Sequence, residues 1–316
     1  MVSSKKKFLK RFLRGTVVAI IVYITVSMLA TKIIYDSVFQ RYDAENIIAF
    51  EKITESDICR KEYSYACGEV SLKGALYSTK KSEYGLVLLI PGFKAEMKEY
   101  EGVIYALLRE GFDVFSFDPT GHGESSGEDS VGFPQIINDV DSTLDFINKK
   151  LKYDKIFLLG HSRGGYGACC ALNSDKNISA VVSVNGVDTA MDAIMAYSTQ
   201  YVGTFAYGNY PFLSLYQNLV FGSELAQRSA VEEINKSDIP VLIIQAKNDE
   251  SIPKEKYSLY SRRGDIVSSN AKTKIYNKSG FDGHKSILYD HKGTPNYDII
   301  KQISAFYKKY NEENSI

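Results

Sequence analysis

Six short apolar runs, separated by segments long enough for helices, constrain the fold of this chain more than any other feature. The runs are YGLVLLI (84–90), FDVFSF (112–117), KIFLLG (155–160), ISAVVSV (178–184), PVLIIQA (240–246) and TKIYNKS (273–279). Helical patterns fit residues 97–110, 133–151, 163–173 and 295–310. Apolar strands that alternate with helices form a mostly parallel sheet covered on both faces. The sequence therefore predicts α/β architecture, with ligands at the carboxyl ends of the strands.

A β-hairpin is predicted ahead of these runs, at YSYACGEVSLKGALYS (63–78), with Gly74 near its bend. Cys59 and Cys67 are close enough in sequence for a small disulfide loop, and the bridged and free forms are equally open. The other two cysteines are adjacent in sequence and have the character of small helix-packing residues. No cysteine or histidine spacing typical of zinc is present, so no metal is expected.

The run TVVAIIVYITVSMLAT (16–31) has no charge and follows the basic stretch SKKKFLKRFLR. A basic flank of this kind is typical of the cytoplasmic side, so we expect membrane insertion, with Lys32 snorkelling at the far side. Extended to residue 35 the segment has about 20 residues, between a signal-peptide core and a full span. Ser27 and Ala30 do not form a clean A-x-A cleavage site, which favours an uncleaved anchor over a signal peptide. The basic flank also disfavours a buried core helix.

Charge is unevenly distributed along the chain. Residues 1–35 contain seven of the 38 basic residues and none of the 38 acidic ones, so the remainder has a net charge of −7. No cationic surface is left for nucleic acid, which is not expected as a partner. The predicted organisation is a basic cytoplasmic tail (1–15), a transmembrane anchor (16–35), a linker (36–59) and a globular domain (60–316). We expect a single-pass protein of the cell membrane with this domain outside the cytoplasm.

The interval 187–239 breaks the alternation, because about 50 residues separate two strands where a helix and short loops would suffice. It is rich in aromatic residues: Tyr197, Tyr201, Phe205, Tyr207, Tyr210, Phe212, Tyr216 and Phe221. We interpret it as a cap insertion over the strand ends, with an apolar underside that faces a substrate. Ordinary additional helices are the alternative.

Gly160-His161-Ser162-Arg163-Gly164 satisfies the pattern G-x-S-x-G. A nucleophile on a tight strand-to-helix turn has a strained backbone, and larger side chains flanking it would clash. The pattern alone is weak, since it arises by chance in roughly one in ten chains of this composition. Here it directly follows an apolar run and precedes small helix formers, which is the context that the nucleophile requires.

A serine becomes a good nucleophile only when a histidine accepts its proton and a carboxylate orients that histidine. Among four histidines, His284 follows the last predicted strand in SGFDGHKSIL and can reach the strand ends, so we predict it as the base. His161 is beside the serine, where the turn should aim its side chain away. His122 is expected to stabilise a loop, and His291 lies in a polar stretch.

The acid should follow the preceding strand, and PVLIIQAKNDESIP offers Asp249 there. Glu250 is an alternative and Asp282 a more distant one. The order Ser162, Asp249, His284 is that of the α/β-hydrolase arrangement. The oxyanion would take backbone N–H groups from Arg163 and from Phe93, after the turn in LLIPGFK. A plain strand-end turn is the alternative for Phe93.

The chain resembles the α/β-hydrolase superfamily over nearly all of residues 60–310. The resemblance is carried by LVLLIPGF, FSFDPTGHGESSG, GHSRGG, AKNDESIP and GHKSIL, in that order. The chain is most similar to the branch of monoacylglycerol-lipase-like and proline-iminopeptidase-like enzymes, and more closely to membrane-anchored serine hydrolases of Gram-positive bacteria. Members of this branch have a helical cap after the sixth strand, which matches 187–239. One departure is Pro91-Gly92, where many relatives have His-Gly.

The resemblance implies acyl transfer to water by Ser162, His284 and Asp249, with no metal or organic cofactor. An aromatic cap favours apolar acyl or aryl esters, so a carboxylesterase or lipase-like enzyme acting on a small-molecule ester is expected. An exopeptidase is an alternative and needs a carboxylate in the cap for the amino group of its substrate. Three glutamates are available there, namely Glu224, Glu232 and Glu233. An acyltransferase and a non-catalytic binding protein on a hydrolase scaffold are further alternatives.

Overall fold

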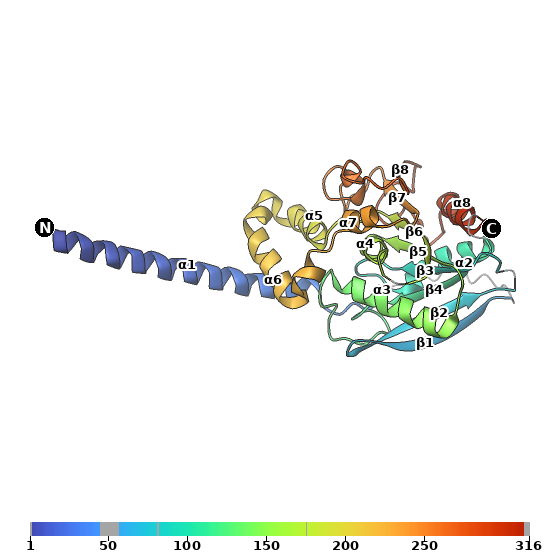
Figure 1. The fold of residues 1–316 in the computed structure, drawn as a ribbon, viewed down its shortest axis with the longest axis horizontal. Coiled ribbons are helices and arrows are strands. Elements are labelled where there is room, and N and C mark those ends of the chain that lie inside the picture. The colour runs from blue at the N-terminus through green and yellow to red at the C-terminus, as the bar shows by residue number, and fades with distance from the viewer. Residues whose placement is uncertain (1, 45–56, 81, 175, 313–316) are drawn as a thin grey trace.

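The computed structural model describes residues 2–44, 57–80, 82–174 and 176–312 (Figure 1). A long N-terminal helix, α1 (Val2–Val38), projects from a globular body. Residues 2–15 of the predicted tail and all of the predicted anchor fall within α1, and Lys5–Val38 contains a window long and apolar enough to cross a membrane. Of the predicted linker, residues 45–56 lie outside the described residues.

The body is built on one eight-stranded sheet with the order β1-β2-β4-β3-β5-β6-β7-β8. Its strands are β1 (Cys59–Cys67), β2 (Val70–Ser78), β3 (Leu86–Ile90), β4 (Asp113–Asp118), β5 (Ile156–His161), β6 (Ile178–Val184), β7 (Val241–Ala246) and β8 (Ala271–Tyr276). The β1–β2 and β2–β4 pairs are antiparallel, and the other five pairs are parallel. The predicted mostly parallel α/β sheet is confirmed.

The predicted hairpin is present, but its turn is at Gly68 and Glu69, because Cys67 pairs with Val70. Gly68 has φ +58°, a left-handed conformation that favours glycine. The prediction of a bend near Gly74 is wrong, since this residue lies inside β2. A Cβ there would be 2.7 Å from the ring of Phe115, so close packing against β4 explains the glycine.

A disulfide between Cys59 and Cys67 is excluded, because the two residues are at opposite ends of one nine-residue strand. At about 3.3 Å per residue they are separated by roughly 26 Å, whereas a disulfide needs Cα atoms within about 7 Å. All four cysteines are free, and all four belong to the described part of the chain.

Helices cover both faces of the sheet, and alternate side chains of each central strand enter two different cores. Leu86 and Leu88 of β3 face the core beneath α3 (Gln135–Phe146) and α4 (Arg163–Cys170). Val87 and Leu89 face the opposite core, beneath α2 (Glu101–Arg109) and α8 (Tyr297–Glu312). A 3₁₀ turn, η1 (Met97–Tyr100), precedes α2, and a π-helical segment, η2 (Ile147–Leu151), continues α3.

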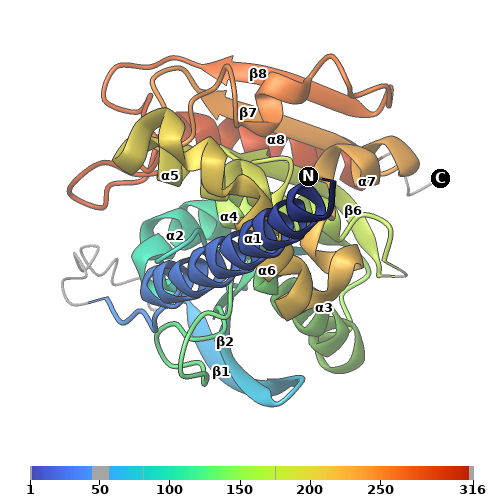
Figure 2. The same ribbon diagram turned by 90° about the vertical axis from the view of Figure 1, so that its left-hand side faces the viewer.

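Between β6 and β7 the chain forms α5 (Ala190–Val202), a 3₁₀ turn η3 (Gly203–Phe205), α6 (Ala206–Ala226) and α7 (Ala230–Lys236). Here α7 packs against α4 in the body, and α5 packs against α6. Figures 1 and 2 show α5 and α6 at the end of the body from which α1 projects, and α6 contacts α1 directly. Thus α5 and α6 are the additional elements of the predicted cap interval.

Candidate active site

Ser162 lies on a strained turn between a strand and a helix. Strand β5 ends at His161 and α4 begins at Arg163, so Ser162 alone makes the connection. Its backbone has φ 55° and ψ −117°, a conformation that is costly for a residue with a Cβ. In this conformation the hydroxyl of Ser162 lies above the carboxyl end of the parallel strands.

The glycines on both sides of the serine are required by close backbone approach. A Cβ on Gly160 would lie 2.1 Å from the carbonyl oxygen of Gly164. A Cβ on Gly164 would lie 2.2 Å from the carbonyl oxygen of Ile90, in the neighbouring strand β3. The G-x-S-x-G pattern therefore reflects packing of the turn against the sheet.

The structure brings Ser162, His284 and Asp249 together from three distant parts of the chain. Nε2 of His284 is 2.9 Å from Oγ of Ser162, and Nδ1 is 2.9 Å from both carboxylate oxygens of Asp249. A carboxylate only accepts hydrogen bonds, so Nδ1 carries the proton and Nε2 presents its lone pair to the serine hydroxyl. All three side chains are buried.

Asp249 is fixed by donors from the end of β7 and from its own loop. Its carboxylate accepts hydrogen bonds from Nε2 of Gln245 at 2.9 Å and from the backbone N–H groups of Ser251 (2.9 Å) and Ile252 (2.8 Å). Glu250 has a different role from Asp249, because its Oε2 accepts the backbone N–H of His284 at 3.0 Å. Asp282, the third candidate acid, accepts a hydrogen bond from Nδ2 of Asn248.

The remaining histidines differ in their surroundings. His122 is buried, its Nδ1 donates to the carbonyl of Thr120 at 2.9 Å, and burial lowers its pKa to about 4. This agrees with the predicted loop-stabilising role. His291 lies on the exposed surface.

His161 belongs to a directed chain of hydrogen bonds beneath the site. Its Nε2 donates to the carbonyl of His284 at 2.9 Å, so its Nδ1 accepts from the hydroxyl of Tyr100 at 2.8 Å. The oxygen of Tyr100 in turn accepts the backbone N–H of Gly92 at 3.0 Å. These hydrogen bonds connect the predicted oxyanion loop to the backbone of His284. Sequence analysis missed Tyr100, since nothing in its spacing points to Gly92 or His161.

A cavity of about 180 Å³ opens above Ser162. Its lining includes Gly92 and Phe93 of the predicted oxyanion loop, Tyr197 of α5, and Glu250 and Lys285. A Cβ on Gly92 would lie 3.4 Å from Cβ of Ser162, so this loop runs directly beside the serine. Arg163 is the first residue of α4, and N–H groups in a first helical turn have no partner within the helix. The amides of Phe93 and Arg163 as oxyanion donors remain a prediction.

The side chain of Arg163 supports the same loop from below. It is fully buried, and it donates to the carbonyls of Gly132 (2.7 Å) and Phe133 (3.1 Å). Its guanidinium carbon is 5.9 Å from the ring centre of Phe93 and 5.8 Å from that of Phe133. Burial lowers the pKa of Arg163 to about 10. No sequence spacing indicates this arrangement, because the partners of Arg163 precede it by at least 30 residues.

Tyr197 is the residue through which the predicted cap lines this cavity. Burial, with the nearby Asp249, raises its pKa to about 12. The three glutamates considered for an exopeptidase lie elsewhere, since none of them is among the residues that line this cavity. Glu233 binds Nδ2 of Asn173 and pairs with Arg228.

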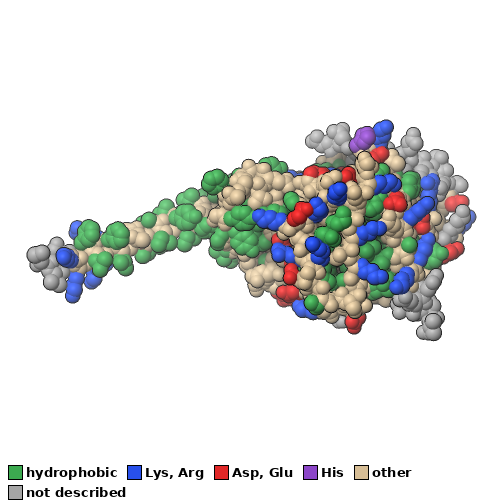
Figure 3. Space-filling model, turned by 90° about the horizontal axis from the view of Figure 1, so that it is seen from above, with side chains coloured by type: hydrophobic (Ala, Val, Ile, Leu, Met, Phe, Trp, Pro, Cys, Tyr) green, Lys and Arg blue, Asp and Glu red, His purple; other side chains and the backbone are tan. Residues whose placement is uncertain are grey.

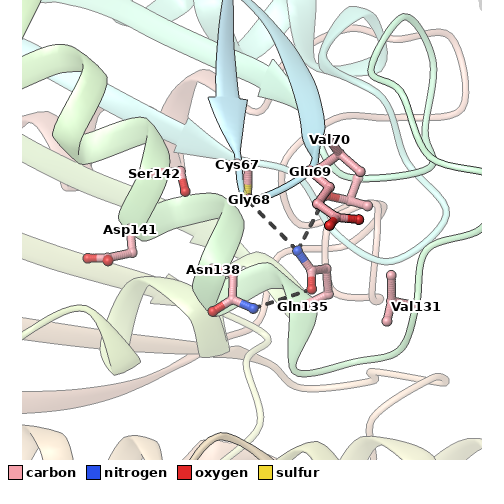
Figure 4. A pocket seen from close by; sticks show the side chains of 10 residues that line it. Cys67, Gly68, Glu69, Val70, Val131, Gln135, Asn138, Asp141 and Ser142 are labelled. Carbon is pink, nitrogen blue, oxygen red and sulfur yellow. Dashed lines mark hydrogen bonds between the residues drawn. The ribbon is translucent and has the colours of Figure 1, made fainter. Parts of the chain in front are cut away.

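A larger cavity of about 430 Å³ lies between the β1–β2 turn and α3 (Figure 4). There, Nε2 of Gln135 is close to the sulfur of Cys67, and Asn138 donates to Oε1 of Gln135 at 3.3 Å. Burial raises the pKa of Cys67 to about 11, which keeps this thiol protonated and unreactive. The smaller cavity therefore remains the better candidate for chemistry.

Comparisons with known proteins agree with the geometry. The model of the serine aminopeptidase S33 family matches residues 81–201. The chain is also 28% identical over 89 residues to protein phosphatase methylesterase 1 of Candida albicans. That match covers 28% of this chain and only 25% of the Candida protein.

Similar solved structures cover more of the chain. An esterase of Pyrococcus furiosus superposes with a TM-score of 0.63 at 18% identity, covering 85% of this chain and 99% of the esterase. A putative lipase of Acinetobacter baumannii has a TM-score of 0.58 at 17% identity, with 81% and 93% covered. Proline iminopeptidase of Mycobacterium smegmatis has a TM-score of 0.56 at 13% identity, with 79% and 99% covered. The chain therefore has the α/β-hydrolase fold, as its motifs predicted.

Proposed function

We propose that this α/β-hydrolase is a membrane-anchored serine hydrolase that cleaves carboxylic esters through an acyl-enzyme. The observation that carries the proposal is a pair of contacts at the base of a cavity: Oγ of Ser162 is 2.9 Å from Nε2 of His284, and Nδ1 of His284 is 2.9 Å from the carboxylate of Asp249. This arrangement suits acyl transfer, with Ser162 as the nucleophile, His284 as the base and Asp249 as the acid that orients the base.

In the first half of the reaction, Oγ of Ser162 attacks the ester carbonyl carbon while Nε2 of His284 takes its proton. The imidazolium that forms is stabilised by Asp249 and returns the proton to the leaving alcohol as the C–O bond breaks. Water then attacks the acyl-enzyme, giving its proton to His284, which returns it to Oγ as the carboxylic acid leaves.

Negative charge develops on the carbonyl oxygen in both halves, and we assign its stabilisation to the backbone N–H groups of Phe93 and Arg163. The support for this assignment is the closeness of the Gly92–Phe93 loop to Ser162 and the position of Arg163 at the start of α4. Both donors lie on rigidly held backbone, because Tyr100 holds Gly92 and the buried guanidinium packs on the Phe93 ring.

The cavity favours esters with a modest apolar group near the carbonyl. Phe93 and Tyr197 form aromatic walls, and a volume of about 180 Å³ accommodates a short acyl or aryl group. The esterases among the similar structures are consistent with this substrate class.

An exopeptidase is the second candidate, and Glu250 is the observation that favours it. This carboxylate lines the cavity and is exposed, so it is available to a substrate amino group. The matching family model is that of a serine aminopeptidase, and a proline iminopeptidase shares the fold.

We further propose that α1 anchors the protein, with its basic start in the cytoplasm and the hydrolase body outside. The uncharged run within α1 and its basic N-terminal flank support this orientation.

The test is turnover of a series of p-nitrophenyl esters, alongside aminoacyl p-nitroanilides, by the full chain in detergent micelles. We expect ester hydrolysis that is abolished by Ser162→Ala and reduced by roughly 10⁴-fold by Asp249→Asn, which leaves His284 in the wrong tautomer. Preference for the anilides, with loss of that preference in Glu250→Gln, would favour the exopeptidase. Ester turnover that survives in Ser162→Ala would contradict both proposals.

A further inference from the structure

A long stretch of the cap has no charge and is exposed. No Asp, Glu, Lys, Arg or His occurs from residue 193 to residue 223. Outside α1, the described residues include ten exposed large apolar side chains, and eight of these lie between residues 201 and 220. They are Tyr201, Val202, Phe205, Tyr207, Tyr210, Leu215, Leu219 and Val220. Such a concentrated apolar patch marks an interaction surface.

This surface is continuous with α1. The ring of Phe212 in α6 is 5.7 Å from that of Tyr23 in α1, and the ring of Tyr216 is 5.0 Å from that of Tyr35. Nδ2 of Asn209 also donates to Oγ1 of Thr31 at 3.3 Å. Figure 3 shows apolar side chains running from α1 onto the adjoining end of the body.

The positions of these contacts place α6 at a defined depth. If Arg14 marks the inner boundary of the hydrocarbon, Tyr23 lies about 14 Å above it, near the middle of a core about 30 Å thick. Tyr35 lies about 32 Å above Arg14, at the outer boundary. Because α6 packs against α1 between Tyr23 and Tyr35, it lies at the depth of the outer half of the bilayer.

We propose that the segment 201–220, formed by the end of α5, η3 and α6, is embedded in the outer leaflet of the bilayer that holds α1. Tyrosine side chains favour the membrane–water interface and phenylalanine side chains the hydrocarbon, and the absence of charge from 193 to 223 removes the main cost of burial in lipid. Lys256, which contacts Tyr207 from outside the segment, is exposed, and its long side chain can place the ammonium among the headgroups. The Asn209–Thr31 hydrogen bond pairs polar groups that lipid cannot satisfy.

The inference also deepens the proposed function, on which this part rests, by assigning the route of the substrate. Tyr197 belongs to the same helix as Tyr201 and lines the cavity above Ser162. Phe93, another cavity residue, has its ring 6.2 Å from that of Tyr197 and 5.3 Å from that of Phe39, which follows α1. The cavity wall thus continues into the embedded surface, so the substrate is an ester that is dissolved in the bilayer.

Because the chain contains no tryptophan, a single introduced tryptophan reports its own surroundings. The full chain is reconstituted in phosphatidylcholine vesicles, with or without bromine atoms on the acyl chains, which quench nearby tryptophan fluorescence. The test variants are Phe205→Trp and Leu219→Trp, at positions that are 88% and 69% exposed in the protein. Ile21→Trp in α1 is the embedded reference. Val267→Trp, 80% exposed and shortly before β8, is the aqueous reference.

We expect Phe205→Trp and Leu219→Trp to show the blue-shifted emission and bromine quenching of Ile21→Trp. Quenching as weak as that of Val267→Trp would overturn the proposal. So would blue-shifted emission that brominated lipid does not quench, because another protein surface would then cover the patch. A failure of Ile21→Trp itself to be quenched would also overturn it, since α1 would not be in the bilayer.

The substrate route is tested with Phe205→Gln combined with Leu219→Gln. We expect turnover of water-soluble p-nitrophenyl acetate to be unchanged. Turnover of p-nitrophenyl palmitate dissolved in the vesicles should fall on the order of tenfold, because two large apolar contacts with lipid are lost. An equal effect on both esters would contradict delivery from the bilayer. If the unmodified protein hydrolyses neither ester, the proposed function fails, while the quenching result still decides where the cap lies.

Discussion

Two histidines lie next to each other in the site, with ring centres 5.1 Å apart, and their contacts separate their roles. Both nitrogens of His161 are engaged, one with Tyr100 and one with the carbonyl of His284. Burial and the neighbouring His284 lower the pKa of His161 to about 3, so it stays neutral. His161 therefore holds the backbone of His284, whereas the side chain of His284 faces the serine.

Tyr100→Phe tests this positioning role. The substitution removes the hydroxyl that bonds to the N–H of Gly92 and to Nδ1 of His161, so both buried groups lose their partner. We expect the free energy of unfolding to fall by about 1–3 kcal/mol. We also expect kcat to fall while KM changes little, because the oxyanion loop and the base lose alignment. Urea unfolding and ester kinetics measure the two effects. The exposed Tyr297→Phe is the control, and an equal response of both variants would contradict the role.

His122 should make the protein sensitive to acid. Its pKa is about 4 when folded and 6.5 in the unfolded reference, so below pH 6.5 the unfolded state binds the proton first and stability falls. His161 acts in the same direction. Asp118 acts in the opposite direction, because burial raises its pKa from 3.8 to about 6 and the folded state then binds the proton first.

Burial also raises the pKa of Glu99 and of Asp192, which act with Asp118, but by less than it lowers the pKa of the two histidines. We therefore expect the free energy of unfolding to decrease between about pH 7 and about pH 4.5. His122→Asn keeps a donor for the carbonyl of Thr120 but does not titrate, so its decrease should be smaller. Urea unfolding at both pH values measures the difference. An identical decrease in the two proteins would show that His122 is not the source.

At the scale of elements, the turn between β5 and α4 has the strictest packing requirement. Gly164→Ala places a methyl group 2.2 Å from the carbonyl oxygen of Ile90, so β3 and α4 must separate. We expect loss of ester hydrolysis and a lower melting temperature. Gly208→Ala is the control, because a Cβ at that position has nothing within 4 Å. Normal activity of Gly164→Ala would mean that the turn tolerates a shift of the helix.

Sequence patterns predicted most of the strands and helices, because the periodicity of apolar residues that forms each of them is local in the sequence. The apolar runs at 84–90 and 155–160 became β3 and β5, and the short loops around them left few other arrangements. Gly74 was misread because the reason for a glycine there is the ring of Phe115, about 40 residues away. The proposed triad was predictable in the same way as the strands, since each member directly follows a predicted strand or its loop.

At the scale of the whole molecule, α1 and the body form one packed unit. Phe39, immediately after α1, is 4% exposed, with its ring 4.4 Å from that of Tyr35 and 5.3 Å from that of Phe93. Its carbonyl accepts hydrogen bonds from the backbone N–H and the hydroxyl of Ser130. The sequence could not predict this docking, because an anchor of the same composition serves equally well as a loose tether.

Phe39→Ala should therefore lower the free energy of unfolding by about 3–5 kcal/mol, the usual cost of removing a buried phenylalanine. Ester turnover should fall as well, because Phe93 loses the ring that supports it. Both are measured on the full chain in micelles. Val38→Ala is the matched control, since Val38 is exposed in the last turn of α1. Equal stability of the two variants would indicate that the anchor does not dock.

The most direct test of the account is the mapping of a fluorophosphonate adduct by mass spectrometry of peptides from the reconstituted full chain. These reagents phosphonylate serines that a neighbouring base has activated. We predict one adduct, on Ser162, that is absent from Ser162→Ala and forms far more slowly in His284→Ala. No adduct on Ser162, or an undiminished rate in His284→Ala, would contradict the central claim that Ser162, His284 and Asp249 form a working nucleophile.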